Sequence, residues 1–205
     1  WVLDDWRLGP DGQVDPRFVT RHDLAHDGRW GQMVTVNGDS AQEMTVRPGE
    51  RVRLRLVNTS NGRVYRPDFG DLQAKVIAVD GMYTSRPLSP EGFEIAPGNR
   101  LDLDIEIPRG AAGRTFSIVD RFTRRPFLLS SVKVEGEAVE ARNFASPSNP
   151  NVPNWRGAAE RDVDHMYRLN ASRGGEHGIQ WMINGRPWGE HEPTQLTEGR
   201  WVQVR

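Results

Sequence analysis

Residues 48–58 of the chain read Pro48-Gly49-Glu50-Arg51-Val52-Arg53-Leu54-Arg55-Leu56-Val57-Asn58. After the Pro-Gly turn, three apolar side chains alternate with three arginines. A period of two places the apolar residues on one face of a β-strand and the arginines on the other. Such alternation is typical of a sheet with one face packed on a core and the other in water.

The same pattern recurs on both sides of this strand, and turn dipeptides separate the segments. Asn37-Gly38 and Asp80-Gly81 are the residue pairs that tight β-hairpins favour. One short helical turn is expected near Arg21–His26. The sequence therefore predicts an all-β, Greek-key β-sandwich. Its further strands are expected at Met33–Val36, Glu43–Val46, Gln73–Val79, Leu101–Ile107, Thr115–Val119 and Phe127–Val134.

The alternation also predicts which side chains form the core. We expect the inward positions of each strand to be apolar and buried, and the intervening positions to be polar. The predicted core residues are Val34, Val36, Val52, Leu54, Leu56, Ile77, Val79, Leu101, Leu103, Ile105, Ile107, Phe116 and Ile118.

The organisation of the chain changes after Gly136, where Pro, Asn and Ser become frequent. We predict a first domain at residues 1–145, a linker at 146–160 and the N-terminal part of a second, truncated sandwich unit at 161–205. A weak internal repeat supports two related domains, because a strand ending in Asn-Gly occurs at Val34–Gly38 and again at Trp181–Gly185. Chance similarity of two hairpins is an equally good explanation. The start at Trp1 and the apparent final strand at Arg200–Arg205 suggest a chain cut at both ends.

Composition excludes several function classes. Lys and Arg number 27 against 28 Asp and Glu, a net charge of -1, so no bulk charge favours nucleic acid or an anionic membrane. The chain has no Cys, which excludes disulfides, thiol nucleophiles and thiolate metal sites within it. Nucleotide-binding glycine loops and a Gly-x-Ser-x-Gly elbow are absent from the sequence.

Histidines are the first candidates for a metal site. His22 and His26 would share a face of the short helix and could hold a metal with Asp23 or Asp27. An exposed loop with His26 as a hydrogen-bonding anchor is the competing and favoured interpretation. The remaining histidines, His165, His177 and His191, are interpreted separately as surface or packing residues.

Acidic, basic and aromatic residues give no catalytic pattern either. Asp4 and Asp5 precede Trp6 on the opening strand. Asp102, Asp104 and Glu106 are explained as a solvated strand face, and Arg51, Arg53 and Arg55 as a solvated face or one that pairs with a neighbouring domain. The tryptophans suit core and inter-domain packing better than a stacking platform; they are Trp1, Trp6, Trp30, Trp155, Trp181, Trp188 and Trp201.

Several segments, in order, resemble the middle domain of three-domain multicopper oxidases, the laccase-like bacterial enzymes. The most similar stretch is Pro48–Asn61. The others are Val2–Leu8, His26–Gly31 leading into Val34–Gly38, Val76–Gly81, Ile95–Asp102, and Trp181–Arg186, which resembles the opening of the third domain. The resemblance covers most of residues 1–135 and then 165–205, and it implies a cupredoxin-like sandwich.

The resemblance also implies a function for a longer parent protein. Such oxidases take single electrons from a reducing substrate, such as a phenol or a metal ion, and reduce dioxygen to water at copper centres. Their copper ligands lie in His-x-His and His-Cys-His motifs, which this sequence lacks. We therefore expect no catalytic, cofactor-binding or metal-ligating residue here, and copper only in the parent, with ligands outside this chain. The segment alone is expected to be inactive.

The expected role is a scaffold and a wall of the substrate cleft. The expected partners are the adjacent first and third cupredoxin domains, the reducing substrate and dioxygen, with no nucleic acid and no membrane. Family resemblance implies a periplasmic or secreted location. The alternative is a copper-free binding or assembly protein of the same superfamily, like its cell-division member. A stand-alone sugar- or protein-binding sandwich is a third hypothesis.

Overall fold

The computed structural model describes residues 1–40, 42–143, 148, 163–199 and 202–205. They form two compact units, one comprising Trp1–Phe18 with Asp27–Asn149 and the other Val19–His26 with Pro150–Arg205. We call them unit 1 and unit 2. The predicted linker at 146–160 lies, except for Ser148, outside the described residues, so the predicted domain boundaries stay a proposal.

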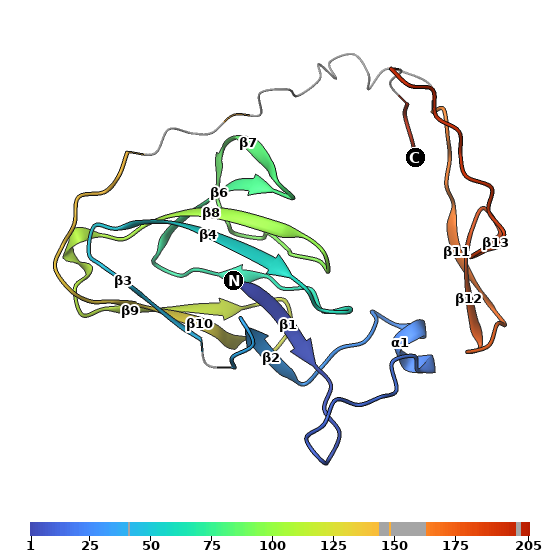
Figure 1. Cartoon of the computed structure of the whole chain (residues 1–205), viewed down its shortest axis with the longest axis horizontal. Coiled ribbons are helices and arrows are strands. Elements are labelled where there is room, and N and C mark those ends of the chain that lie inside the picture. The colour runs from blue at the N-terminus through green and yellow to red at the C-terminus, as the bar shows by residue number, and fades with distance from the viewer. Residues whose placement is uncertain (41, 144–147, 149–162, 200–201) are drawn as a thin grey trace. The chain divides into compact units, whose positions relative to one another are not determined.

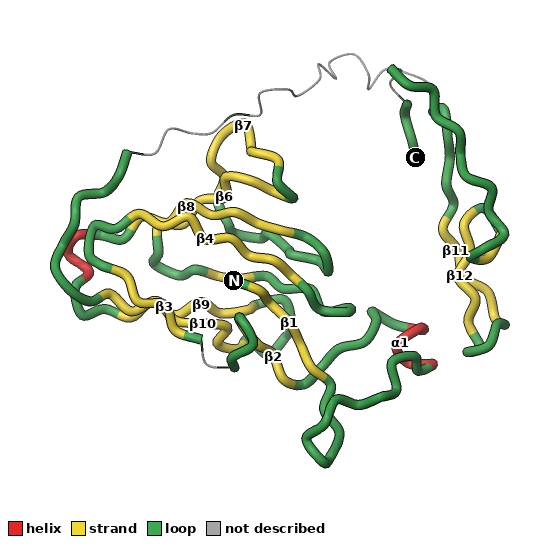
Figure 2. The backbone as a smooth tube through the Cα atoms, viewed as in Figure 1, coloured by secondary structure: helices red, strands yellow, loops and turns green. Residues whose placement is uncertain are grey.

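Unit 1 is a β-sandwich of two sheets, as predicted (Figures 1 and 2). One sheet has the strand order β2-β1-β4-β8-β6-β7 and the other β3-β10-β9-β5. One turn of 3-10 helix lies at Arg109–Ala111. The strands are β1 (Val2–Trp6), β2 (Met33–Val36), β3 (Glu43–Val46), β4 (Arg51–Asn58), β5 (Pro67–Asp68), β6 (Gln73–Val79), β7 (Met82–Leu88), β8 (Arg100–Glu106), β9 (Thr115–Asp120) and β10 (Phe127–Val134).

The sheets mix parallel and antiparallel strand pairs. β1 runs parallel to β4, and β3 runs parallel to β10, while the other strand pairs are antiparallel. The reason is the path of the chain: β2 lies in the six-stranded sheet, β3 in the other, and β4 returns to the first. Such crossings between sheets are what a Greek-key sandwich requires.

The core lies between the two sheets and matches most of the prediction. Val34 and Val52 are only partly buried and pack against its margin. A single cluster joins side chains from both sheets, including Val132 and Val134, which were not predicted. The confirmed members are Val36, Leu54, Leu56, Leu101, Leu103, Ile105, Ile107, Phe116 and Ile118.

The prediction for β6 was wrong in its register. Ala74 and Val76 enter the core cluster, whereas Ile77 is buried outside it and Val79 is 36% exposed. The strand is also irregular between Val76 and Ala78, where the pairing shifts by one residue against β8 and by three residues against β7. A bulge of this kind breaks the period of two, so simple alternation fails beyond it.

The predicted hairpin turns have the geometry that their residues favour. Asn37 and Gly38 both have positive φ angles, 54° and 83°, and so do Asn184 and Gly185, at 51° and 76°. Asp80-Gly81 connects β6 to β7 in the same way. Two successive left-handed residues are the type I′ pattern that fits the twist of paired strands.

Unit 2 contains a small antiparallel sheet and the predicted helical turn. The sheet has the order β11-β12-β13, with β11 at Leu169–Arg173, β12 at Ile179–Ile183 and β13 at Arg186–Pro187. Helix α1 spans Arg21–Ala25. The strand predicted at the C-terminus is reduced, among the described residues 202–205, to an isolated bridge from Val204 to His165.

The sheet of unit 2 has one apolar face that stays exposed. Paired positions place Leu169, Trp181 and Ile183 on the same side, while Asn170 and Ser172 lie on the other. Leu169 is 74% exposed and Trp181 56%. An amphipathic sheet needs a second layer to cover its apolar face, so the partial second sandwich unit stays a prediction.

Candidate functional site

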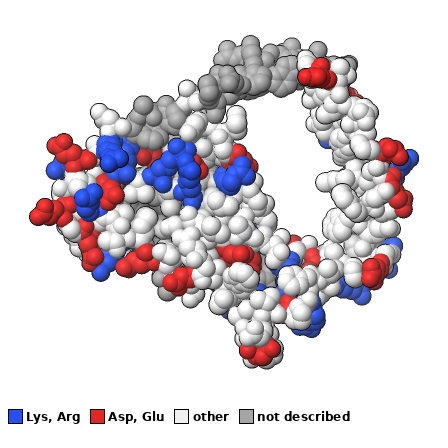
Figure 3. All heavy atoms as spheres, viewed as in Figure 1, with Lys and Arg blue, Asp and Glu red and all other residues white. Residues whose placement is uncertain are grey.

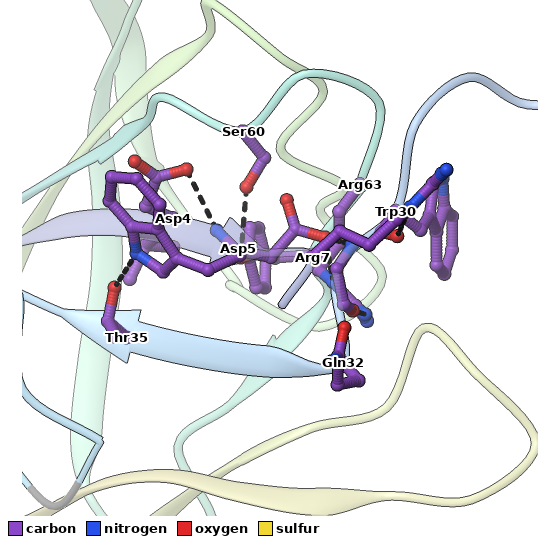
Figure 4. A network of polar contacts seen from close by, with 12 residues as sticks. Asp4, Asp5, Arg7, Trp30, Gln32, Thr35, Ser60 and Arg63 are labelled. Carbon is purple, nitrogen blue, oxygen red and sulfur yellow. Dashed lines mark hydrogen bonds and ion pairs between the residues drawn. The ribbon is translucent and has the colours of Figure 1, made fainter. Parts of the chain in front are cut away.

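The most constrained polar site in unit 1 is centred on Arg63, and we call it the Arg63 joint (Figure 4). Nε of Arg63 lies 3.1 Å from Oδ2 of Asp5, and Nη2 donates to the carbonyl oxygen of Gly31 at 2.7 Å. The same Asp5 oxygen accepts from the backbone N–H of Gly31. One buried ion pair thus holds together β1, the segment before β2 and the loop after β4.

Aromatic rings enclose the guanidinium of Arg63. Its Cζ atom lies 4.6 Å from the centroid of the Trp30 ring and 6.0 Å from that of Phe127. A cation over an aromatic face is attracted by the ring quadrupole, more strongly when water is excluded. Trp30 is fixed in turn, because its Nε1 donates to the carbonyl of Asp27 and its own carbonyl accepts from Nε of Arg7.

Gly31 is required at the joint for steric reasons. A Cβ atom at this position would lie 2.2 Å from the carbonyl carbon of Trp6, well inside any real contact. The backbone before β2 therefore runs directly against β1. Gly62 is similar, since a Cβ there would lie 2.7 Å from the carbonyl oxygen of Asp27. Two glycines let the three segments approach closely enough for the Arg63 contacts.

Beside the joint, the loop after β4 is held by a buried hydrogen-bond network. Nδ2 of Asn58 donates to the carbonyl oxygens of Arg63 and Ile95, both at 2.8 Å. The hydroxyls of Ser60 and Tyr65 lie 3.0 Å apart. Burial is the main cause that raises the pKa of Tyr65, and the hydrogen bond with Ser60 only partly opposes it. Tyr65 therefore stays protonated and serves as a hydrogen-bonding group rather than a base.

Two buried carboxylates are incompletely satisfied. Oδ1 of Asp5 and Oδ2 of Asp120 are buried and have no hydrogen-bond partner. The other oxygen of Asp120 accepts from the backbone N–H of Arg66 at 2.6 Å. Burial raises the pKa of Asp120, although that hydrogen bond, another from the backbone N–H of Phe122, and the charges of Arg63 and Arg66 act in the opposite direction. Because one buried oxygen of Asp120 lacks a hydrogen bond, ionising this carboxyl costs free energy.

The charged outer face of the six-stranded sheet differs from its sequence-based interpretation. Arg51 makes two hydrogen bonds to Asp104, and Arg53 bonds Asp102 and the hydroxyl of Tyr83. Arg55 lies 3.6 Å from Asp102. The arginines of β4 therefore neutralise the charges of the aspartates of β8. Asp104 is buried rather than solvated. Basic and acidic side chains are accordingly mixed over this part of unit 1 in Figure 3.

The histidine candidates do not form a ligand set. The rings of His22 and His26 lie 4.5 Å apart, centroid to centroid, so the predicted shared face is confirmed. His191 contacts the carbonyl of Arg186 through Nε2, and His165 uses its backbone in the bridge to Val204. His177 lies in the turn between β11 and β12. Within the described part of the chain, no group of three or more His, Asp or Glu side chains is placed to hold a metal ion.

Only part of the tryptophan prediction is confirmed. Trp1 packs against the core, and Trp30 contributes to the Arg63 joint. Trp6 is 39% exposed, and its Nε1 donates to the Thr35 hydroxyl on the outer face. Trp181 and Trp188 are exposed, so neither packs in a core, and inter-domain packing stays a prediction for them. Trp155 and Trp201 lie outside the described residues. In the same described part, no helix is long and apolar enough to cross a membrane.

Sequence reasoning missed the centre of this site. Asp5 was considered only as one of two acids before Trp6, and neither Arg63 nor Asp120 was singled out. The one available signal was the glycine on each side of the joint, Gly31 and Gly62, because isolated glycines indicate close backbone approach.

Comparison with known proteins gives consistent results. The family model described as "Multicopper oxidase" matches residues 3–130. The chain is 32% identical over 199 residues to the cell division protein FtsP of Rahnella sp. (strain Y9602), covering 89% of this chain and 40% of that protein. It is 28% identical over 184 residues to multicopper oxidase LPR1 homolog 5 of Oryza sativa subsp. japonica, covering 82% of this chain and 25% of that protein.

A solved structure has the same architecture. The multi-copper oxidase from Pseudomonas thermotolerans is 29% identical and superposes with a TM-score of 0.66, over 82% of this chain and 39% of that one. The fold of unit 1 is a cupredoxin-like sandwich. The chain spans between a quarter and two fifths of the length of these relatives.

Proposed function

Because the chain belongs to the multicopper oxidase family, we propose that it is the middle cupredoxin domain, with the start of the third, of a larger oxidase. In that parent it spaces the first and third domains and forms a wall of the cleft for the reducing substrate. The observation that carries the proposal is a sandwich of this family's fold in which the most constrained polar site, the Arg63 joint, holds backbone segments together and leaves its ionic groups bonded to the protein itself.

The residues present do not fit a copper centre. A blue-copper site requires a Cys thiolate together with imidazoles, and this chain has no Cys. The paired rings of His22 and His26 have no third ligand among the described residues. Copper chemistry in the proposed parent therefore belongs to residues outside this chain. The chain's own part is to hold the adjacent domains at a fixed spacing.

A copper-free role is the second proposal, and a specific finding favours it. One relative that covers 89% of the chain is named a cell division protein. On this alternative the same sandwich serves binding or assembly, without electron transfer. Both versions imply a periplasmic or secreted protein with cupredoxin domains as its intramolecular partners.

Copper content and turnover of the parent separate the two proposals. The longer protein that contains this sequence would be loaded with copper, dialysed, and assayed for bound metal, blue absorption and oxygen consumption with a phenolic substrate. Stoichiometric copper with turnover supports the oxidase. A folded parent that retains no copper supports the assembly protein and contradicts the oxidase. The 205-residue chain is the matched control, expected to bind no stoichiometric copper in either case.

A further inference from the structure

A pocket of about 870 Å³ opens in unit 1, away from the Arg63 joint. It lies where the smaller sheet stops covering the larger one. The edge strand β5 has only two residues. On the other sheet, β7 pairs with β6 only from Val76 onward, so the first three residues of β6 lack this neighbour. Loops after β5 and β7 close the remaining space. The sandwich is thus incompletely covered here, and a ligand-sized space results.

The inner part of the pocket is apolar. Phe69, Leu72 and Ala74 line it and are also members of the core cluster. Pro67 and Pro90 add rigid apolar walls. A small apolar group that entered this space would exchange water for packed side chains, which is favourable in proportion to the area buried.

The rim of the pocket is charged and has an excess of positive charge. Three cations, Arg66, Lys75 and Arg121, line it against two acids, Asp68 and Glu91. Nε of Arg121 bonds Oδ2 of Asp68, whose other oxygen accepts from the backbone N–H of Gly70. Both oxygens of Asp68 are therefore engaged by the protein itself.

The positive charge of Lys75 remains available to a ligand. Its partner across the sheet is Asp104, but that carboxylate is bonded twice by Arg51. Within the residues that the structure describes, Lys75 forms no ion pair. Arg66 is partly engaged, because Nη1 lies 3.7 Å from Glu94 in a half-exposed pair and Nη2 donates to the carbonyl oxygen of Arg121. An ammonium and a guanidinium thus remain to receive an anion at the mouth.

We propose that this pocket binds a small organic carboxylate with an apolar body. The carboxylate lies between Lys75 and Arg66, and the apolar body lies over Phe69 and Leu72. Glu91, on the same rim, weakens binding through like-charge repulsion. The site requires no copper and no electron transfer, so it is independent of the proposed function.

Benzoate is a suitable probe, because benzamide has the same shape without the charge and acetate has the charge without the ring. Calorimetric titration of the 205-residue chain should show saturable binding of benzoate at one site. Benzamide and acetate should each bind at least about tenfold more weakly, and added salt should weaken benzoate binding. Equal binding of benzamide, or no saturable binding of benzoate, would overturn the proposal.

Three variants test the geometry. Lys75→Gln should raise the dissociation constant of benzoate about fivefold or more, and Glu91→Gln should lower it. Arg114→Gln is the matched control, because Arg114 is a half-exposed arginine paired with Asp71 outside the pocket. All three side chains lie on the surface, so the melting midpoint should stay unchanged. Benzoate binding that is equal in Lys75→Gln and in the unaltered chain would show that the pocket does not use this charge.

Discussion

Arg63 and Asp5 are separated by 58 positions in the sequence, yet their side chains form an ion pair with almost no exposure to water. Asp5 belongs to β1, the first strand, and Arg63 to the loop after β4. Removal of one partner from a buried pair leaves the other charge without compensation, and this costs more than the pair itself contributes.

Asp5→Asn should therefore destabilise unit 1 strongly. The variant leaves Arg63 buried without its counter-ion, so the free energy of unfolding should fall by about 3–5 kcal/mol. Urea unfolding monitored by tryptophan fluorescence measures this loss. Asp71→Asn is the matched control, because the pair of Asp71 with Arg114 is exposed; it should change stability by less than about 1 kcal/mol. Equal effects of the two substitutions would show that burial does not govern the Arg63 joint.

Gly31→Ala should also be destabilising, by overpacking rather than by electrostatics. The added methyl group would lie 2.2 Å from the backbone of Trp6, so the segment before β2 must move away from β1. We expect a loss of about 1–3 kcal/mol or more. Gly110→Ala is the control, because nothing lies within 4 Å of its added Cβ and its φ angle is not positive. Thermal unfolding of both variants gives the comparison, and an unshifted midpoint for Gly31→Ala would contradict the close approach.

Leu54→Ala and Val79→Ala test the register of the sandwich. Leu54 is buried between the sheets, so its truncation should cost about 2–5 kcal/mol. Val79 was predicted to be equivalent but is partly exposed beyond the β6 bulge, so its truncation should cost less than about 1 kcal/mol. Denaturant unfolding of both variants in parallel provides the measurement. Equal losses would show that Val79 is packed as tightly as Leu54 and would contradict its partial exposure.

These residues show how far sequence reasoning reaches. Leu54, Leu56 and Leu103 follow a strict period of two, which depends only on local backbone geometry, so their burial was predictable. The hairpin at Asn184-Gly185 was predictable for the same reason.

The features that were missed depend on contacts between distant segments. The β6 bulge is fixed by pairing with two other strands, and Arg51 finds Asp104 only once β4 and β8 are adjacent. The Arg63 joint unites three segments, of which the sequence shows only the glycines. Tertiary contacts of this kind leave no periodic signal in a single sequence.

Asp120 leads to a prediction about pH. Burial raises the pKa of its carboxyl above the ordinary value of 3.8, so the folded state binds this proton more tightly than the unfolded state does. The resulting contribution to stability is complete below the unfolded pKa and is lost as the pH rises through the folded pKa. Asp120→Asn removes this titration. The variant should gain stability relative to the unaltered chain as the pH rises from about 3 toward neutrality.

Asp68 supplies the control of opposite sign. The backbone N–H of Gly70 and the guanidinium of Arg121 lower the pKa of Asp68, so its contribution is present above the unfolded pKa and is lost as the pH falls through the folded pKa. Urea unfolding at a series of pH values, with each variant subtracted from the unaltered chain, cancels the titration of all other groups. The difference should change with pH in opposite directions for Asp120→Asn and Asp68→Asn. Slopes of the same sign would mean that the folded chain lowers the pKa of Asp120 instead of raising it, and that its unsatisfied oxygen has a partner after all.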